Sequence, residues 1–296
     1  MRAHDRPAPR VLVALEDADA VAVLGARPRW HVLRRVRVPA GPHNLTASAV
    51  QGLAAVTSPS ADRVSVLDAA GRIVARARVP GAPHDAAFAG RRGILWISAE
   101  RAGRLVALDP RTGRTLRTVT TGGPPHDLAV SPDGRRLWVT LDGSDAVEIR
   151  SAVSGHLLRR SPLGGAPHDL AFAPGGPRVW LSNVGSPLLT VATAAGRRLR
   201  TLAAGTEPHH FAFGLGRLWA SDNGGGALLR IAPGRRRILG RTPVGLAPHH
   251  VVIAGRAVLV AVHGTGKIAV VSPSGRQRYA VRVGPGPHGI DTVSAR

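Results

Sequence analysis

Apolar and polar positions alternate along this chain in short runs separated by turn residues, and one stretch shows the pattern clearly. Asp127–Val130 is a short apolar run, Arg136–Thr140 is rich in β-branched and aromatic residues, and Ala146–Ile149 alternates. Ser131–Gly134 has the composition of a type I turn. A more polar run begins at His156. The pattern predicts four strands and essentially no helix, because no stretch has a sustained 3.6-residue apolar period with caps.

The same pattern repeats along the chain and is marked by the dipeptide Pro-His. This dipeptide occurs seven times, and successive histidines lie 39 to 42 residues apart. A period near 40 residues with four strands in each period is typical of a β-propeller blade. The seven histidines are His43, His84, His126, His168, His209, His249 and His288.

The two ends of the chain predict how the ring of blades closes. Val11–Ala14 aligns with the second strand of the repeat, so the first blade lacks its inner strand. The last Pro-His is followed by one more strand, Gly289–Val293. Pairing the two ends removes two exposed sheet edges. We therefore predict an all-β, seven-bladed β-propeller with four antiparallel strands per blade, with the first blade closed by the C-terminal strand. It occupies residues 11–296 as a single domain, after a polar N-terminal tail at residues 1–10.

One motif in the third full repeat is similar to that of a known group of proteins. The residues Pro-x-x-Leu-Ala-Val-Ser-Pro-Asp-Gly at 125–134, followed by Leu-Trp-Val-Thr at 137–140, resemble the YVTN repeat of seven-bladed β-propellers. The resemblance covers nearly the whole chain. It implies the fold but says almost nothing about function, because this fold hosts binding modules and enzymes alike.

Composition excludes some chemistry and narrows the partners. The chain has no cysteine, which rules out disulfides, thiolate metal sites, iron–sulfur clusters and a cysteine nucleophile. Its formal charge is +22, and the arginines fall mostly around the third turn and fourth strand of each repeat, at the predicted outer rim. Basic residues spread over every repeat, with few aromatic residues for base stacking, disfavour a nucleic-acid partner.

The N-terminus and the hydropathy pattern indicate where in the cell the protein is found. Residues 1–10 are polar and lack the apolar segment of a signal peptide. No apolar run approaches 18 residues, so we expect no membrane span. As written, the sequence predicts a soluble, cytoplasmic monomer, and an exported form if the start is truncated.

Each Pro-His comes directly before an innermost strand, which begins at one mouth of the central channel in such propellers. The seven imidazoles should therefore form a ring at that mouth. The second strand of each blade ends on the same face, and two blades carry a second histidine. We expect the polar residues at these strand ends and the second histidines to orient the imidazoles or to contact a ligand. They are Glu16, Glu100, Asp142, Asp222, His210, His250 and His263.

A ring of neutral imidazoles without thiolates favours a transition metal, namely Cu, Zn or Ni. Three or four converging rings are enough for a site with an open position, and nearby carboxylates can orient the rings. A small-molecule ligand is the other occupant that this mouth suggests. The histidines could also be purely structural. Blades arise by duplication, so a Pro-His that only guides the chain from a loop into a strand would recur in every blade, with its imidazole bonded to the backbone of a neighbouring blade and no ligand bound.

Two enzyme resemblances suggest specific chemistry. The propeller of nitrous oxide reductase also presents seven histidines, to a copper–sulfide cluster, which supports a copper site here but not that reaction. The spacing of His168, Glu207 and His209, with Asp222 one strand later, is similar to the site of the streptogramin B lyase family. That resemblance implies a Mg²⁺-dependent lyase that opens a cyclic ester, with these first three residues as catalytic groups.

Three functional hypotheses follow from the sequence. The first is a metal- or ligand-binding propeller, which as an enzyme would be a metal-dependent lyase or oxidoreductase acting on a small molecule. The second is the streptogramin B lyase-like enzyme. The third is a non-catalytic scaffold with a protein partner.

Overall fold

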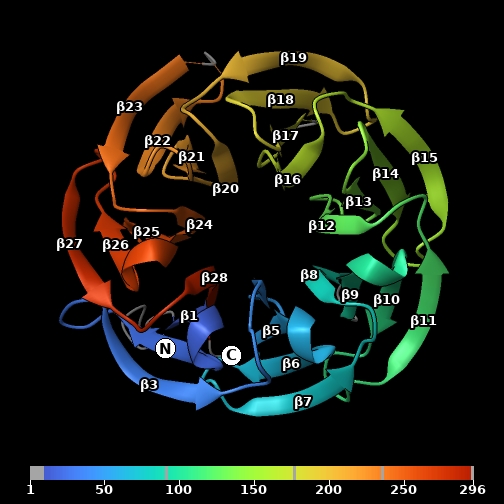
Figure 1. Ribbon diagram of the computed structural model, residues 1–296, viewed down its shortest axis with the longest axis horizontal. Helices are drawn as coiled ribbons and strands as arrows, with labels where there is room; N and C mark the ends of the chain where they lie inside the picture. The colour runs from blue at the N-terminus through green and yellow to red at the C-terminus, as the bar shows by residue number, and fades with distance from the viewer. Residues whose placement is uncertain (1–9, 91–92, 176–177, 235–236, 295–296) are drawn as a thin grey trace, which may run out of the picture.

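A computed structural model describes residues 10–90, 93–175, 178–234 and 237–294. These residues form seven four-stranded antiparallel sheets arranged around a central channel (Figure 1). The predicted all-β, seven-bladed propeller is confirmed. β1 begins at Arg10, the last residue of the predicted tail, and residues 1–9 lie outside the described part of the chain.

The innermost strands line the channel, and the second strands pair with them. The innermost strands are β28 (Pro287–Val293), β4 (Leu45–Ser48), β8 (Pro83–Ala89), β12 (Pro125–Val130), β16 (Pro167–Phe172), β20 (Pro208–Gly214) and β24 (Pro248–Ala254). The second strands are β1 (Arg10–Leu15), β5 (Leu53–Ser58), β9 (Ile94–Ala99), β13 (Arg136–Leu141), β17 (Arg178–Asn183), β21 (Arg217–Asp222) and β25 (Ala257–Val262).

The third strands are largely buried, and the fourth strands form the circumference of the disc. The third strands are β2 (Ala20–Gly25), β6 (Arg63–Asp68), β10 (Arg104–Leu108), β14 (Ala146–Ser151), β18 (Leu188–Thr193), β22 (Ala227–Ala232) and β26 (Lys267–Val271). The fourth strands are β3 (His31–Arg37), β7 (Ile73–Arg78), β11 (Thr115–Thr120), β15 (Leu157–Pro162), β19 (Arg198–Ala203), β23 (Arg237–Pro243) and β27 (Gln277–Arg282).

The hydrophobic core lies between neighbouring blades. Trp96, Trp138, Trp180 and Trp219, each on a second strand, are almost completely buried. The indole N–H of Trp96 donates to the carbonyl oxygen of Ala152 in the next blade, at 2.8 Å. Burial of these large side chains between sheets holds the blades in a fixed angular order, and this order positions the channel residues.

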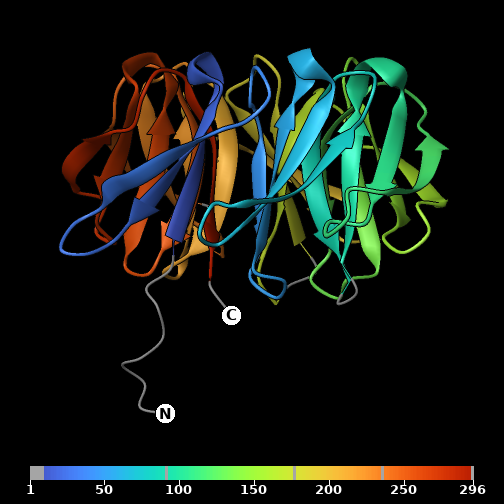
Figure 2. The ribbon, with the colours of Figure 1, turned by 90° about the horizontal axis from the view of Figure 1, so that it is seen from below.

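Strand β28 closes the ring by pairing with β1, as the ends of the sequence predict. Val11 pairs with Thr292, Leu12 with Asp291 and Val13 with Ile290. Figure 1 shows β28 next to β1 in this blade, and Figure 2 shows the blades standing side by side around the disc when it is turned by 90°.

Local turns agree with the sequence pattern, with one addition. The Ser131–Gly134 turn has the expected bond from the Gly134 N–H to the Ser131 carbonyl, and Gly134 has a φ of 70°. The described residues also contain four single turns of 3₁₀ helix that the apolar pattern did not predict, because one turn is too short for a helical period. These are η1 (Glu16–Ala18), η2 (Pro59–Ala61), η3 (Glu100–Ala102) and η4 (His263–Thr265). In the described part of the chain, no helix is long and apolar enough to cross a membrane.

Candidate metal centre at the channel mouth

The seven Pro-His histidines form a closed ring at one mouth of the channel. Every histidine contacts the next one around the ring, with centroid distances of 3.8 to 4.8 Å between neighbouring imidazoles. The tightest pair is His43 and His288, whose rings stack at 3.8 Å across the point where the first and second blades meet. The ring lines a cavity of about 230 Å³.

Hydroxyl groups on the second strands fix the backbone that carries these histidines. Thr57, Ser98 and Thr140 each donate a 2.7 Å hydrogen bond to a histidine carbonyl oxygen of the next blade. The acceptors are His84, His126 and His168. Each bond joins two blades at the level of the ring, so the position of one imidazole is tied to its neighbour. The sequence pattern did not predict these bonds, although a Thr or Ser at this strand position recurs from blade to blade.

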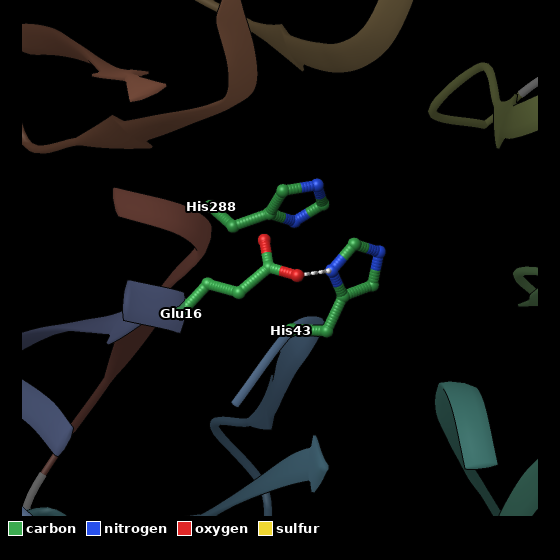
Figure 3. A group of neighbouring side chains, drawn as sticks. All are labelled: Glu16, His43 and His288. Carbon is green, nitrogen blue, oxygen red and sulfur yellow. Dashed lines mark ion pairs between the residues drawn. The ribbon is translucent and has the colours of Figure 1, made fainter. Parts of the chain in front are cut away.

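Two carboxylates, both predicted, contact the ring from the ends of second strands. Glu16 Oε1 lies 3.3 Å from His43 Nδ1, and Glu100 Oε1 lies 3.4 Å from His126 Nδ1. Figure 3 shows Glu16 between His43 and His288, with one carboxylate oxygen facing His43. The 3₁₀ turns η1 and η3 begin at these glutamates and set them above the ring.

The contacts create two groups that each hold one carboxylate and two imidazoles. In the first, ligand atoms of Glu16, His43 and His288 all lie within 4.8 Å of one another. In the second, the same holds for His84, Glu100 and His126. Such a spacing lets one ion reach three donors after small side-chain movements.

Several ring nitrogens have no hydrogen-bond partner among the described residues. The Nδ1 atoms of His84, His209, His249 and His288 are buried and accept or donate no hydrogen bond within the described residues. His288 is only 4% exposed. A buried polar atom without a partner is costly, so these nitrogens are well suited to bind a ligand.

Burial and mutual repulsion keep much of the ring uncharged. Desolvation, together with the neighbouring histidines, lowers the pKa values of His84, His209 and His288 well below the usual range. The same causes lower the pKa of His168 to about 3 and that of His249 to about 4. Neutral imidazole is the form that coordinates a metal.

His263, also predicted as a neighbour of the ring, behaves differently. Its Nε2 lies 3.5 Å from Glu16 Oε2, and this hydrogen bond raises the pKa of His263. Bonds from His263 and His43 in turn hold the pKa of Glu16 well below its usual range. Glu16 therefore bridges two histidines as a carboxylate.

A second layer of polar side chains lies next to the ring in the channel, one residue after six of the seven ring histidines, and Gly289 follows the seventh. The Asp85 and Asp127 carboxylates accept backbone N–H groups of Leu128 and Leu170 in the next blade, at 2.9 and 3.0 Å. His210 Nδ1 accepts the Val251 N–H at 3.3 Å in the same way. Aspartate and histidine share this position because both can accept that bond.

The second layer is also strongly perturbed electrostatically. Burial and the adjacent carboxylate raise the pKa values of Asp85 and Asp127 well above the usual range, and burial raises the pKa of Asp169 to about 7. Burial lowers the pKa of His210 to about 3, and that of His250 well below its usual range. The His210 and His250 rings stack at 4.0 Å. Residues of this layer also line a second cavity in the channel, of about 340 Å³.

The three residues of the lyase-like motif come together in a cavity beside the ring. His168, Glu207 and His209 line this cavity of about 220 Å³, together with Asn183 and Asn223, which the sequence analysis did not single out as ligand contacts. The rings of His168 and His209 lie 4.8 Å apart. Their catalytic roles stay a prediction.

The remaining two predicted acidic residues lie in different surroundings. Asp222 is fully buried, its Oδ1 accepts the N–H groups of Thr206 and Glu207 at 2.8 Å, and Arg241 Nη1 lies 3.2 Å from its Oδ2. These contacts hold the loop that carries Glu207. Asp142 is exposed in the turn after β13.

Comparisons with known proteins identify the fold class. The sequence matches no protein-family model and no curated protein. Among solved structures, a functionally unknown protein from Desulfotomaculum acetoxidans superposes with a TM-score of 0.82 at 10% identity, covering 97% of this chain and 99% of that one. The periplasmic gluconolactonase PpgL of Pseudomonas aeruginosa gives 0.78 at 18% identity, covering 97% and 99%. Virginiamycin B lyase of Staphylococcus aureus gives 0.72 at 18% identity, covering 86% and 91%.

At these identities the likeness shows the fold alone. The chain is a seven-bladed β-propeller, and the fold hosts many activities. The YVTN resemblance stays a prediction, since no family model carries it. A cytoplasmic location also stays a prediction, and one structural neighbour is periplasmic by its name.

Proposed function

We propose that the channel mouth binds a divalent transition metal through its two groups of one glutamate and two histidines. The observation that carries this proposal is the spacing of the donors, within 4.8 Å in each group. Support comes from the buried Nδ1 atoms of His84 and His288, one in each group, which have no partner in the described residues.

The dimensions of the ring favour a metal at one side rather than at the centre. With neighbouring centroids 3.8 to 4.8 Å apart, a regular heptagon has a radius of about 5 Å, whereas a Zn–N bond is about 2.0–2.1 Å. One central ion therefore cannot reach seven nitrogens. Two adjacent imidazoles and the carboxylate above them are a better fit.

The two imidazoles and one carboxylate of each group favour a particular metal and a particular chemistry. Two imidazoles and one carboxylate with open positions are the ligands of catalytic zinc sites, so zinc is favoured here over copper and nickel. A metal with an open position polarises a bound carbonyl oxygen. Two structural neighbours are named a gluconolactonase and virginiamycin B lyase. We infer that the ligand is a small molecule with an ester or lactone group, whose carbonyl a metal held by these glutamates and histidines would polarise.

The lyase-like alternative is favoured by one observation, the shared cavity of His168, Glu207 and His209. In this alternative Mg²⁺ would replace the transition metal. The low pKa of His168, about 3, makes its imidazole a weak base at neutral pH, which weighs against a general-base role for that residue. The scaffold hypothesis has no comparable support.

Elemental analysis tests the proposal directly. Protein purified without a histidine tag is incubated with Zn, Cu or Ni, freed of excess metal and analysed. We expect at least one bound ion per chain, lost in part in E16Q and E100Q and more completely in H43A/H288A and H84A/H126A. The exposed histidines His31 and His156 provide the control substitutions. Less than about 0.1 ion per chain in the wild type would rule out the metal site, because a three-donor site should fill.

A further inference from the structure

A large cavity lies where the last blade meets the first, next to the channel mouth. It has a volume of about 680 Å³, compared with about 230 Å³ for the cavity inside the histidine ring. Its walls come from η4 and from the glycine-rich loop 284–286 before β28, with Arg35 of β3 and Arg282 of β27 at its side. Figure 1 shows β27 and β3 following one another at the circumference, where the ring closes.

Two guanidinium groups give this cavity its charge. Arg35 Nε donates to the Val283 carbonyl oxygen at 2.8 Å, which anchors the guanidinium and leaves its terminal amino groups for a ligand. Arg282 is exposed and has no ion-pair partner within the described ranges. Among the residues that the structure describes, Asp17 is the one carboxylate in the wall. Two arginines against one aspartate leave the cavity with a net positive charge.

The surrounding surface strengthens this charge. The seven outer strands carry fourteen arginines, and within their described bounds they contain no aspartate or glutamate. Fields from a surface of one sign concentrate oppositely charged ligands in adjacent clefts. The cavity thus lies at the edge of an arginine-rich belt formed by these outer strands, and it faces the channel mouth on its other side.

His263 connects this cavity to the first metal-binding group. It lies in the cavity wall, and its Nε2 is 3.5 Å from Glu16 Oε2. Its ring is 5.5 Å from that of His249 and 6.1 Å from that of His288. His263 thus belongs both to the wall of this cavity and to the contacts of Glu16, so a ligand bound in the cavity lies next to the group formed by Glu16, His43 and His288.

We infer that this cavity binds the anionic end, a carboxylate or a phosphate, of the small molecule whose reactive group lies at Glu16, His43 and His288. The assignment of that molecule as a substrate rests on the proposed function. The physical reason is that guanidinium groups bind both anions through paired, charge-assisted hydrogen bonds. The site selects anionic over neutral ligands of the same size.

Calorimetry on metal-free protein tests the anion site separately from the metal site. The probes are glycerol 3-phosphate, glycerate and glycerol, which share a carbon skeleton and differ in charge. The variants are R282Q and R35Q/R282Q, and the control is R76Q/R117Q, which removes two exposed arginines from other outer strands. We expect one or both anions to bind, glycerol not to bind, and R35Q/R282Q to weaken anion binding by about tenfold or more. The control should bind as the wild type does.

The outcomes separate the two proposals. Binding of only one anion supports the site and names the class of its ligand. Three results would overturn the anion site. They are anion binding by R35Q/R282Q as tight as that of the wild type, a weakening in R76Q/R117Q as large as that in R35Q/R282Q, and no anion binding to the wild type. R282Q keeps the hydrogen bond from Arg35 to Val283 and should also bind the anion more weakly. If its thermal midpoint equals that of the wild type, misfolding does not explain the weaker binding. H43A/H288A should lose the metal ion of its own group yet still bind the anion, so failure of the metal site leaves a different signature.

Discussion

Single residues in this channel have properties that follow from their surroundings rather than from their type. Glu16 stays ionised between two histidines, whereas Asp169, only 6% exposed, has its pKa raised by burial to about 7. Asp169 Oδ2 also has no hydrogen-bond partner in the described residues. Opposite pKa shifts in these two carboxylates show that the local environment determines protonation here.

Asp169 leads to a prediction on stability. Its pKa is about 3.9 in an unfolded chain and about 7 in the fold, so its protonated form stabilises the fold at low pH and this contribution is lost as pH rises through about 7. D169N, which keeps the shape without the charge, should therefore be more stable than wild type at pH 8–9, on the order of 1–3 kcal/mol. Below about pH 4, where Asp169 is protonated in the unfolded chain as well, the two should unfold at similar urea concentrations. The control is D142N, because Asp142 is exposed. If D169N were less stable than wild type at pH 9, burial of a charged Asp169 would not destabilise the fold.

At the scale of strands, the ring depends on hydroxyl groups at the ends of second strands. Thr140 Oγ1 accepts the Asp127 N–H at 2.9 Å and donates to the His168 carbonyl oxygen at 2.7 Å, so it joins β12, β13 and β16. The Pro-His spacing predicted the ring of imidazoles, since each dipeptide begins an inner strand. The sequence did not predict this bond, because its two partners lie in different blades and 28 residues apart.

T140V removes both bonds while keeping the side-chain shape. Because it leaves a buried N–H and carbonyl unsatisfied, it should destabilise the protein by about 1–3 kcal/mol. It should also perturb the NMR signals of the His168 imidazole, which a purely local loss of stability would not do. T118V, at an exposed position of β11, is the matched control and should change stability by less than about 0.5 kcal/mol. Unchanged stability of T140V in urea would show that the bond between blades contributes little.

At the scale of the whole molecule, closure of the ring brings distant residues to one place. His288 follows His43 by 245 positions in the sequence, yet their rings stack at 3.8 Å because β28 completes the first blade. The charge is likewise separated, with arginines on the outer strands and carboxylates at the mouth and in the channel.

Many neutral buried histidines make global stability depend on pH. Burial lowers the pKa values of the following seven: His84, His168, His209, His210, His249, His250 and His288. Groups with a lowered pKa stabilise the fold above the unfolded value of about 6.5, and this contribution is lost as pH falls toward the folded values. The raised aspartate pKa values oppose this trend, but they involve fewer groups: Asp85, Asp127, Asp169 and Asp291.

The metal-free protein should therefore lose stability between pH 7 and pH 5, seen as a lower urea midpoint. Added zinc at pH 7 should raise the midpoint, since a ligand that binds the folded state stabilises it. H31Q, at an exposed outer-strand position, should show the same pH slope as wild type. A midpoint that rises on acidification would mean that the ring histidines are solvated and not buried as described.

The sequence by itself determined the number of blades, the order of strands and the identity of the seven ring histidines. It could do so because a propeller repeats one local pattern, and each copy of Pro-His, the turn and the strands is encoded within about 40 residues. The tertiary structure alone shows which groups come together: Glu16 with His43 and His263, the Asp127 carboxylate with the Leu170 N–H, and Arg35 and Arg282 in the wall of one cavity. These contacts join different blades, and their geometry is fixed by the packing between sheets and by the closing strand. No local sequence pattern records that packing.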